Sequence, residues 1–222
     1  MSTGYIFEVM YTFSSALLYP VIIALMLLVL FSLILIGEFL SEYAKRHRDW
    51  KKLEMQCQGL REASQTSNFS EAARLLKDVK QNYMVTGFSR EAGDYLKAGN
   101  FQAVEKLAGD YEIKMAKNLE HTKIVSTIAP MLGLMGTLIP LGPALIGLSS
   151  GDIATLANNL MIAFATTVVG LFAGIVGYVL TQVRRRWYWE DMSDIDYILD
   201  SVEIKESIEE KEKEKEKEKE NE

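Results

Sequence analysis

Three long runs without a charged residue dominate the pattern of polar and apolar positions along the chain. They cover residues 9–37, 124–151 and 153–183, which are 29, 28 and 31 residues long, and each is mainly apolar. A helix rises about 1.5 Å per residue, so roughly 20 apolar residues cross the hydrocarbon core of a bilayer. The pattern therefore predicts three transmembrane helices, which we place at 17–38, 127–148 and 158–183.

The polar stretch after the first span carries helical signals and no pattern typical of strands. Ser70 and Ser89 are expected to begin helices, because serine caps a helix N-terminus well. Gly87 and the Gly99-Asn100 pair are expected to interrupt them. We predict short helices here, followed by a break near residue 100.

A stripe of apolar residues at steps of three and four begins at Phe101 and runs without a break into the second span. It predicts one helix from about Asn100 to Leu148. A weaker stripe after the third span suggests a similar continuation, formed by Met192, Ile195, Ile198 and Leu199. The expected fold class is an all-α membrane protein whose second and third spans have long cytoplasmic helical extensions.

The distribution of basic residues predicts the orientation in the membrane, since Lys and Arg near span ends are retained in the cytoplasm. They cluster after the first span, before the second and after the third, whereas residues 1–16 and 149–157 contain none. We expect these two segments to lie outside, and residues 39–126 and the helix at 184–205 to be cytoplasmic. Residues 187–189, Trp-Tyr-Trp, fit an aromatic belt at the inner interface.

Composition excludes several function classes. The net charge is −6, and the two histidines, His47 and His121, are isolated. The chain has no metal-ligand spacing, no nucleophile elbow and no phosphate-binding loop, so we expect neither enzymatic activity nor a cofactor. The basic segments are expected to touch anionic lipid and not nucleic acid. Residues 206–222 consist mainly of Glu-Lys repeats, which predict a solvated, mobile tail.

The second and third spans each carry a stripe of small and hydroxyl residues on one face. It comprises Ser126, Ala129, Gly133, Thr137, Pro140, Ala144 and Gly147 in the second span, and Ala163, Thr167, Gly170, Gly174 and Gly177 in the third. Small residues favour tight helix packing, which explains the glycines without any further role. Thr137 and Thr167 lie near mid-membrane, where a hydroxyl needs a partner, although its own helix backbone can supply one. Both interpretations remain open.

Two segments of these spans resemble the MotA/TolQ/ExbB proton-channel family, and its three-span TolQ/ExbB type most. Residues 129–137, Ala-Pro-Met-Leu-Gly-Leu-Met-Gly-Thr, are similar to the family's "AP-hydrophobic-LGL-hydrophobic-GT" segment. Residues 162–171, Ile-Ala-Phe-Ala-Thr-Thr-Val-Val-Gly-Leu, resemble its "EAL-hydrophobic-AT-hydrophobic-hydrophobic-GL" segment. The order of the two segments agrees with the predicted topology.

The resemblance implies a pentamer that encloses the single spans of a dimeric ExbD, TolR or MotB-like partner, and that partner carries a membrane aspartate. By motif position, Thr137 and Thr167 match the family's pore-facing threonines, and we add the neighbouring Thr166 to the ion pathway. The residues expected to pack against the partner helix are Gly133, Gly136, Pro140, Ala163, Gly170 and Gly174.

One position departs from the family pattern. Ile162 stands where TolQ and ExbB carry a membrane glutamate, and the second and third spans contain no charged residue. The ion-binding carboxylate must then come from the partner. We expect a stator subunit of an H+- or Na+-driven motor in the inner cell membrane. A passive membrane scaffold and a stand-alone ion channel are the alternatives.

Overall fold

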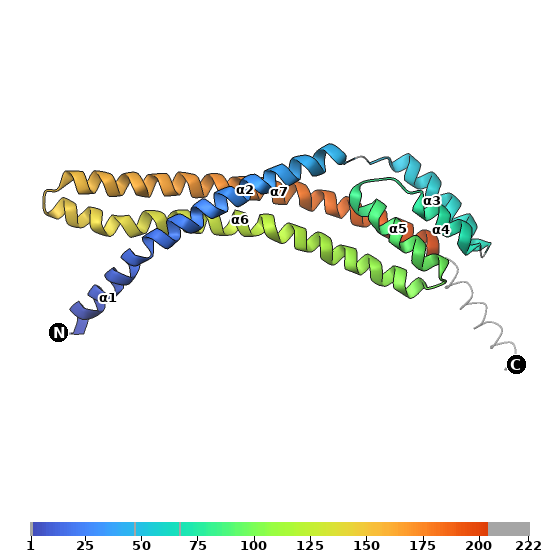
Figure 1. Ribbon diagram of the computed structural model, residues 1–222, viewed down its shortest axis with the longest axis horizontal. Coiled ribbons are helices and arrows are strands. Elements are labelled where there is room, and N and C mark those ends of the chain that lie inside the picture. Colours follow the sequence, from blue (N-terminus) through green and yellow to red (C-terminus); the bar gives the residue numbers. More distant parts are fainter. Residues whose placement is uncertain (1, 47, 67, 204–222) are drawn as a thin grey trace, which may run out of the picture. The chain divides into compact units, whose positions relative to one another are not determined.

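The computed structural model describes residues 2–46, 48–66 and 68–203. Within them the chain forms seven α-helices and no strand (Figure 1). The helices are α1 (Ser2–Ala16), α2 (Leu18–Lys45), α3 (Trp50–Gln65), α4 (Phe69–Lys77), α5 (Tyr83–Lys97), α6 (Phe101–Ser149) and α7 (Ile153–Glu203). The segments Glu8–Lys45, Phe101–Ser149 and Ile153–Val202 are long and apolar enough to cross a membrane. The predicted all-α fold with three spanning helices is confirmed.

The long helix expected before and through the second span is confirmed. α6 is continuous over its 49 residues although it contains Pro130, Pro140 and Pro143. It begins after Gly99, whose φ of +72° ends the preceding helix, as predicted for this position. α7 likewise continues well beyond the third apolar run. The cytoplasmic location of these extensions stays a prediction, and His47 and residues 206–222 lie outside the described residues.

The predicted helix starts at Ser70 and Ser89 are wrong. The capping residues are Asn68 for α4 and Asn82 for α5, whose side-chain oxygens accept hydrogen bonds from backbone N–H groups of the first turn. Ser70 and Ser89 lie inside these helices, and so does Gly87, which does not interrupt α5. Asparagine caps as well as serine does, so residue type alone could not decide between neighbouring candidates.

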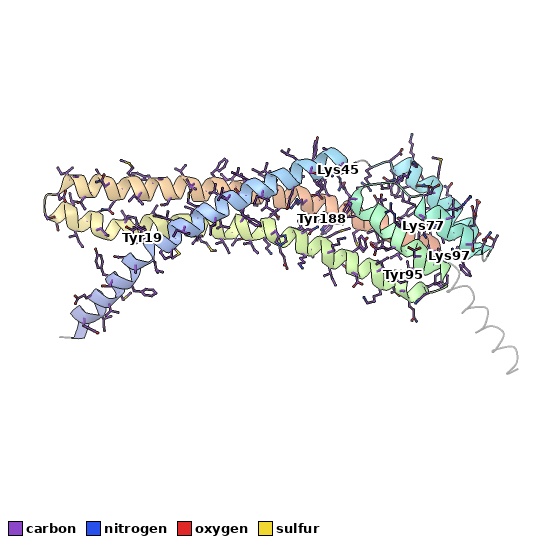
Figure 2. All side chains as sticks on the ribbon, viewed as in Figure 1. Tyr19, Lys45, Lys77, Tyr95, Lys97 and Tyr188 are labelled. Carbon is purple, nitrogen blue, oxygen red and sulfur yellow. The ribbon has the colours of Figure 1, made fainter. Side chains whose placement is uncertain are left out.

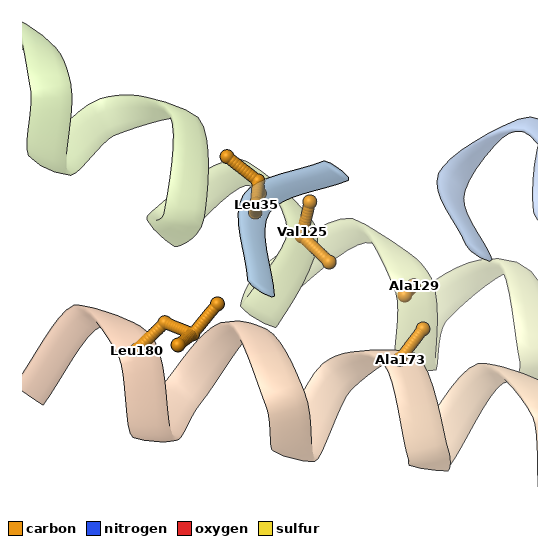
Figure 3. Packing of buried hydrophobic residues seen from close by; sticks show 5 residues of the cluster. All are labelled: Leu35, Val125, Ala129, Ala173 and Leu180. Atoms are coloured by element: carbon orange, nitrogen blue, oxygen red, sulfur yellow. The ribbon is translucent and has the colours of Figure 1, made fainter. Parts of the chain in front are cut away.

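The chain divides into two compact units. The first comprises residues 1–41 and 118–184, and the second comprises residues 42–117 and those from 185 on. In the first unit, α2 packs across α6 and α7 through a buried apolar cluster (Figure 3), formed by Leu35, Val125, Ala129, Ala173 and Leu180. This cluster defines the side of the α6–α7 pair that α2 covers.

The second unit has its own apolar core. α3 packs against α4 and α4 against α5. Figure 2 labels Lys77 at the end of α4, Lys97 at the end of α5 and Tyr188 of α7. The largest fully buried apolar side chains of the unit come from α3, α4, α5 and α7, and they are Leu53, Leu76, Val85, Phe88, Leu96, Ile195 and Ile198.

Two ion pairs with buried aspartates join the segment after α2 to α7 within the second unit. The Arg46 guanidinium lies 2.7 Å from the Asp191 carboxylate, and that of Arg48 lies 2.8 Å from Asp194. The aspartate side chains are only 1% and 0% exposed. Asn82, the cap of α5, also donates to Asp191 at 2.6 Å. Burial raises the pKa of Asp191, while the hydrogen bond and charge of Arg46 act in the opposite direction.

The aromatic belt predicted at residues 187–189 is wrong for two of its three members. Trp187 and Tyr188 are buried inside the second unit, and only Trp189 is exposed. Trp187 stacks on Tyr43 and lies under the Arg46 guanidinium. Trp187 and Tyr188 therefore belong to the core of the second unit. Their position near a span end in the sequence could not distinguish this role from one at the membrane interface.

Arg46→Met should destabilise the protein by about 3 kcal/mol, because it leaves the buried Asp191 carboxylate without its cation. The double variant Arg46→Met, Asp191→Leu should recover most of this loss, since it removes both buried charges. Thermal unfolding of the detergent-purified protein measures both effects.

Arg74→Met is the matched control, because Arg74 forms an exposed ion pair with Glu71. A loss as large in this control, or no recovery in the double variant, would contradict the account of the buried pairs.

Candidate ion pathway

α6 and α7 run antiparallel along a continuous contact within the first unit, which we call the seam. Residues of increasing number in α6 contact residues of decreasing number in α7, and most of these contacts include a glycine. From one end to the other, the contacting pairs are Thr122 with Thr181, Ser126 with Gly177, Pro130 with Gly174, Gly133 with Gly170, Gly136 with Thr166, and Gly147 with Thr155. Twenty-five residues of helix separate the first and last α6 members, a distance of about 38 Å.

Several glycines of the seam leave no room for a side chain. A Cβ atom at Gly170 would lie 2.7 Å from the carbonyl oxygen of Ala129 and 2.8 Å from the Cα of Gly133. A Cβ at Gly136 would lie 2.6 Å from the side chain of Thr166. Since the Gly170 neighbours are backbone atoms, they cannot rotate away. The two helices can approach this closely only because Gly occupies these positions.

The structure thus brings together the small residues singled out in the sequence. Gly133, Gly136, Gly170 and Gly174 all lie in the seam, and Gly174 contacts the Pro130 ring. The other two small residues of the predicted set, Pro140 and Ala163, are buried. This contact joins two helices of one chain, which is the tight-packing interpretation. The role of these residues in packing against a helix of another protein stays a prediction.

The side of the seam on which Thr137 lies follows from helix periodicity. Ala129, Gly133 and Thr137 succeed one another at steps of four residues, and each step turns by about 40° around the α6 axis. Ala129 belongs to the cluster that α2 covers, and Gly133 meets α7. Thr137 therefore lies on the side of the seam away from α2.

Thr167 lies on the same side. Ala173, Gly170 and Thr167 succeed one another at steps of three residues, each of which turns by about 60° around the α7 axis. Ala173 packs toward α2 and Gly170 lies in the seam. Thr137 and Thr167 consequently flank the seam together, on a surface that we call the threonine face.

The hydroxyl groups on the threonine face are partly exposed. Thr137 Oγ1 donates to the Leu134 carbonyl at 2.7 Å, and Thr167 Oγ1 donates to the Ala163 carbonyl at 3.2 Å. With the hydrogen engaged on the helix backbone, each oxygen presents its lone pairs outward. Such oxygens accept a hydrogen bond from water, a hydronium ion or a protonated carboxyl group, and they also coordinate a cation.

Thr166 lies on the other side of the seam. Its side chain is 7% exposed, contacts Gly136, and donates to the carbonyls of Ile162 or Ala163 at 3.0 and 2.9 Å. This packing gives Thr166 a part in holding the helices together on the side covered by α2. Its assignment to the ion pathway stays a prediction.

A polar contact between Thr122 and Thr181, which was not predicted from the sequence, closes one end of the seam. Their hydroxyl oxygens lie 2.8 Å apart, and each also lies within reach of a carbonyl of its own helix. Thr122 is fully buried. The signal was available, because Thr122, Ser126 and Ala129 extend the small-residue spacing of the second span by one more turn.

No carboxylate or metal cluster accompanies the threonines. Residues 124–151 and 153–183 contain no charged side chain, and Ile162 is partly exposed. Within the described part of the chain, no group of three or more His, Cys, Asp or Glu residues could hold a metal ion. This chain alone supplies hydroxyl oxygens at the threonine face and no ionisable group.

Comparison with protein-family models matches residues 75–196 to the MotA/TolQ/ExbB proton channel family. This range covers more than half of the chain and includes both motif segments, the seam and the threonine face. The chain belongs to the MotA/TolQ/ExbB proton channel family. The resemblance predicted from residues 129–137 and 162–171 is confirmed, and three apolar helices are compatible with its three-span TolQ/ExbB type. A search of curated proteins finds no match to the chain.

Membership of the MotA/TolQ/ExbB family makes the chain a multi-pass membrane protein of the proton-channel class. This class works in oligomeric complexes with a partner and is not a family of enzymes. The seam and the threonine face are therefore features of a channel-type subunit.

Gly170→Ala should disrupt the seam, because its methyl group would overlap backbone atoms of α6 that cannot move aside. We expect a lower melting temperature and loss of oligomer in gel filtration. Gly37→Ala in α2 is the control, since nothing lies within 4 Å of a Cβ at Gly37. Normal stability of Gly170→Ala would show that the helices are not in close contact.

Proposed function

We propose that this chain is the channel subunit of an ion-driven motor, which couples H+ or Na+ flow to mechanical work through a single-span partner of the ExbD, TolR or MotB type. The observation that carries the proposal is the position of Thr137 and Thr167. They flank one seam, on the side that α2 leaves uncovered. In this proposal the threonine faces of five subunits surround a dimer of the partner.

The rest of the threonine face is suited to contact with another helix. Leu134, Phe164 and Leu171 lie beside the two threonines and are at least half exposed. A ring of such faces forms an apolar lining in which only hydroxyl groups are polar at mid-membrane depth. A partner helix would bury the apolar residues, and a polar side chain on that helix would form hydrogen bonds with the threonine hydroxyls.

The charge that carries the ion must come from that partner, because this chain has no ionisable group beside the threonines. A membrane aspartate of the partner would bind and release the ion next to Thr137 and Thr167, whose oxygens accept hydrogen bonds. One charge crossing 100 mV releases about 2.3 kcal/mol, so a few ions suffice for a conformational step. The pentamer would move relative to the dimer at each step.

The distribution of basic residues supports an inner-membrane orientation with the N-terminus outside and the C-terminus in the cytoplasm. Under this proposal the second unit lies in the cytoplasm. Exposed basic residues near the span ends, such as Lys123, Arg185 and Arg186, then face anionic headgroups. Arg46 and Arg48 contribute less, since their charges are paired with aspartates.

Thr137→Val and Thr167→Val should each abolish most of the ion flux, because valine keeps the shape and removes the accepting oxygen. The complex is purified by a tag on this chain, its single-span component is identified by mass spectrometry, and flux is measured in vesicles under an imposed potential. Thr12→Val in α1 is the matched control. Normal flux in both variants of an intact complex would refute the proposal.

The same preparation separates the alternatives. A passive scaffold predicts no ion flux and no intimate single-span component. A stand-alone channel predicts flux from this chain reconstituted without any partner. The motor subunit predicts flux only when a partner with a membrane carboxylate is present.

A further inference from the structure

A second group of polar side chains lies along the seam, toward the end of the first unit at which residues 118 and 184 form its limits. Ser126 comes from α6, and Tyr178 and Gln182 come from α7. The Gln182 amide donates to the Tyr178 hydroxyl at 3.0 Å, and both side chains are exposed, Tyr178 to 59%. No other part of the described chain covers these two side chains. Neither the tight packing of the seam nor the threonine pair explains them.

Helix geometry places this group on the threonine face. Ser126 precedes Thr137 by eleven residues, and Tyr178 follows Thr167 by eleven. A stretch of eleven helical residues exceeds three full turns by about 20° and advances about 16 Å along the axis. Ser126 and Tyr178 thus lie nearly in line with Thr137 and Thr167, and Gln182 follows Tyr178 by about one turn of α7.

A contact across the seam shows that the two helices present this group at the same level. A Cβ atom at Gly177, the neighbour of Tyr178, would lie 2.6 Å from the backbone nitrogen of Ser126. The Val125 side chain, next to Ser126, packs in the cluster toward α2. The polar group and the α2 contact therefore lie on different sides of the seam at this level, as they do at the threonines.

The group offers both kinds of hydrogen-bonding partner. Ser126 Oγ donates to the Lys123 carbonyl at 2.9 Å and presents its lone pairs. The Tyr178 hydroxyl accepts from Gln182, so its own hydrogen is free to be donated. Beyond the hydrogen bond between them, the Tyr178 hydrogen and the other polar atoms of the Gln182 amide would lack partners if they faced hydrocarbon, which is costly. Val179, at the same depth but on the far side of α7, is apolar and exposed.

We infer that Ser126, Tyr178 and Gln182 form a second polar tier of the ion pathway, which begins about 16 Å from the threonine pair along the seam. The tier binds the water that hydrates the ion between the threonines and the end of the pathway. This inference rests on the proposed function, because it requires the threonine face to line the pathway.

Cysteine accessibility tests whether water reaches the tier. The only cysteine, Cys57, is buried and is replaced by alanine to give a background without thiols. In the complex, Ser126→Cys and Tyr178→Cys should react with a membrane-impermeant cationic methanethiosulfonate. Val179→Cys, at the same depth, should not react. Reaction of Val179→Cys alone, or of none of the three, overturns the inference.

Ion flux tests whether the tier serves the pathway. Ser126→Ala and Gln182→Leu should each lower the flux of the reconstituted complex about fivefold, the effect of one lost hydrogen bond. Ser149→Ala is the matched control, because Ser149 also donates to a carbonyl of its own helix but lies at the other end of α6. Its flux should equal that of the unaltered protein.

The outcomes separate the two proposals. Unchanged flux in Ser126→Ala and Gln182→Leu, with flux abolished by Thr137→Val, would refute the second tier and leave the proposed function intact. Unchanged flux in all of these variants, in an intact complex, would refute both the tier and the proposed function. Reduced flux in the tier variants together with labelling at Ser126→Cys supports the tier.

Discussion

The close approach of two helix backbones at Gly133 and Gly170 is the constraint on which the rest of the first unit depends. A methyl group at Gly170 would overlap backbone atoms of α6, and one at Gly133 would lie only 3.2 Å from the Gly170 Cα and the Thr166 carbonyl oxygen. With the axial and rotational setting of α6 and α7 fixed in this way, every other side chain on the two helices has a defined direction. Residues on one side of the seam, such as Ala129 and Ala173, pack against α2. Residues on the other side, such as Thr137 and Thr167, are not covered by α2.

This division into two sides explains why three threonines close to the same seam differ in exposure. Thr166 is buried beside Gly136 on the side of α2, where its hydroxyl donates to carbonyls of its own helix. Thr137 and Thr167 are partly exposed on the opposite side. Because helix carbonyls take the hydrogen of each hydroxyl, the oxygens act as acceptors. An uncharged, accepting surface of this kind suits a channel whose ionisable group belongs to another protein.

The spans, the long helix and the small-residue stripes could be predicted from the sequence, because runs without charge and a period of 3.6 residues are local properties. The family could be predicted from two short motifs in the order expected. The side on which Thr166 lies could not, since it depends on where α2 packs. Nor could the pairing of Arg46 with Asp191, which joins residues 145 positions apart. Neighbouring polar residues compete to cap a helix, so Asn68 was missed in favour of Ser70.

Electron cryo-microscopy of the complex, purified with its partner, would show what surrounds the two hydroxyl groups. We expect Thr137 and Thr167 of every subunit to face a central space that holds the helices of the partner, with α2 on the outside. A map in which these two threonines face acyl chains, or in which α2 lies between them and the centre, would refute the proposed ion pathway.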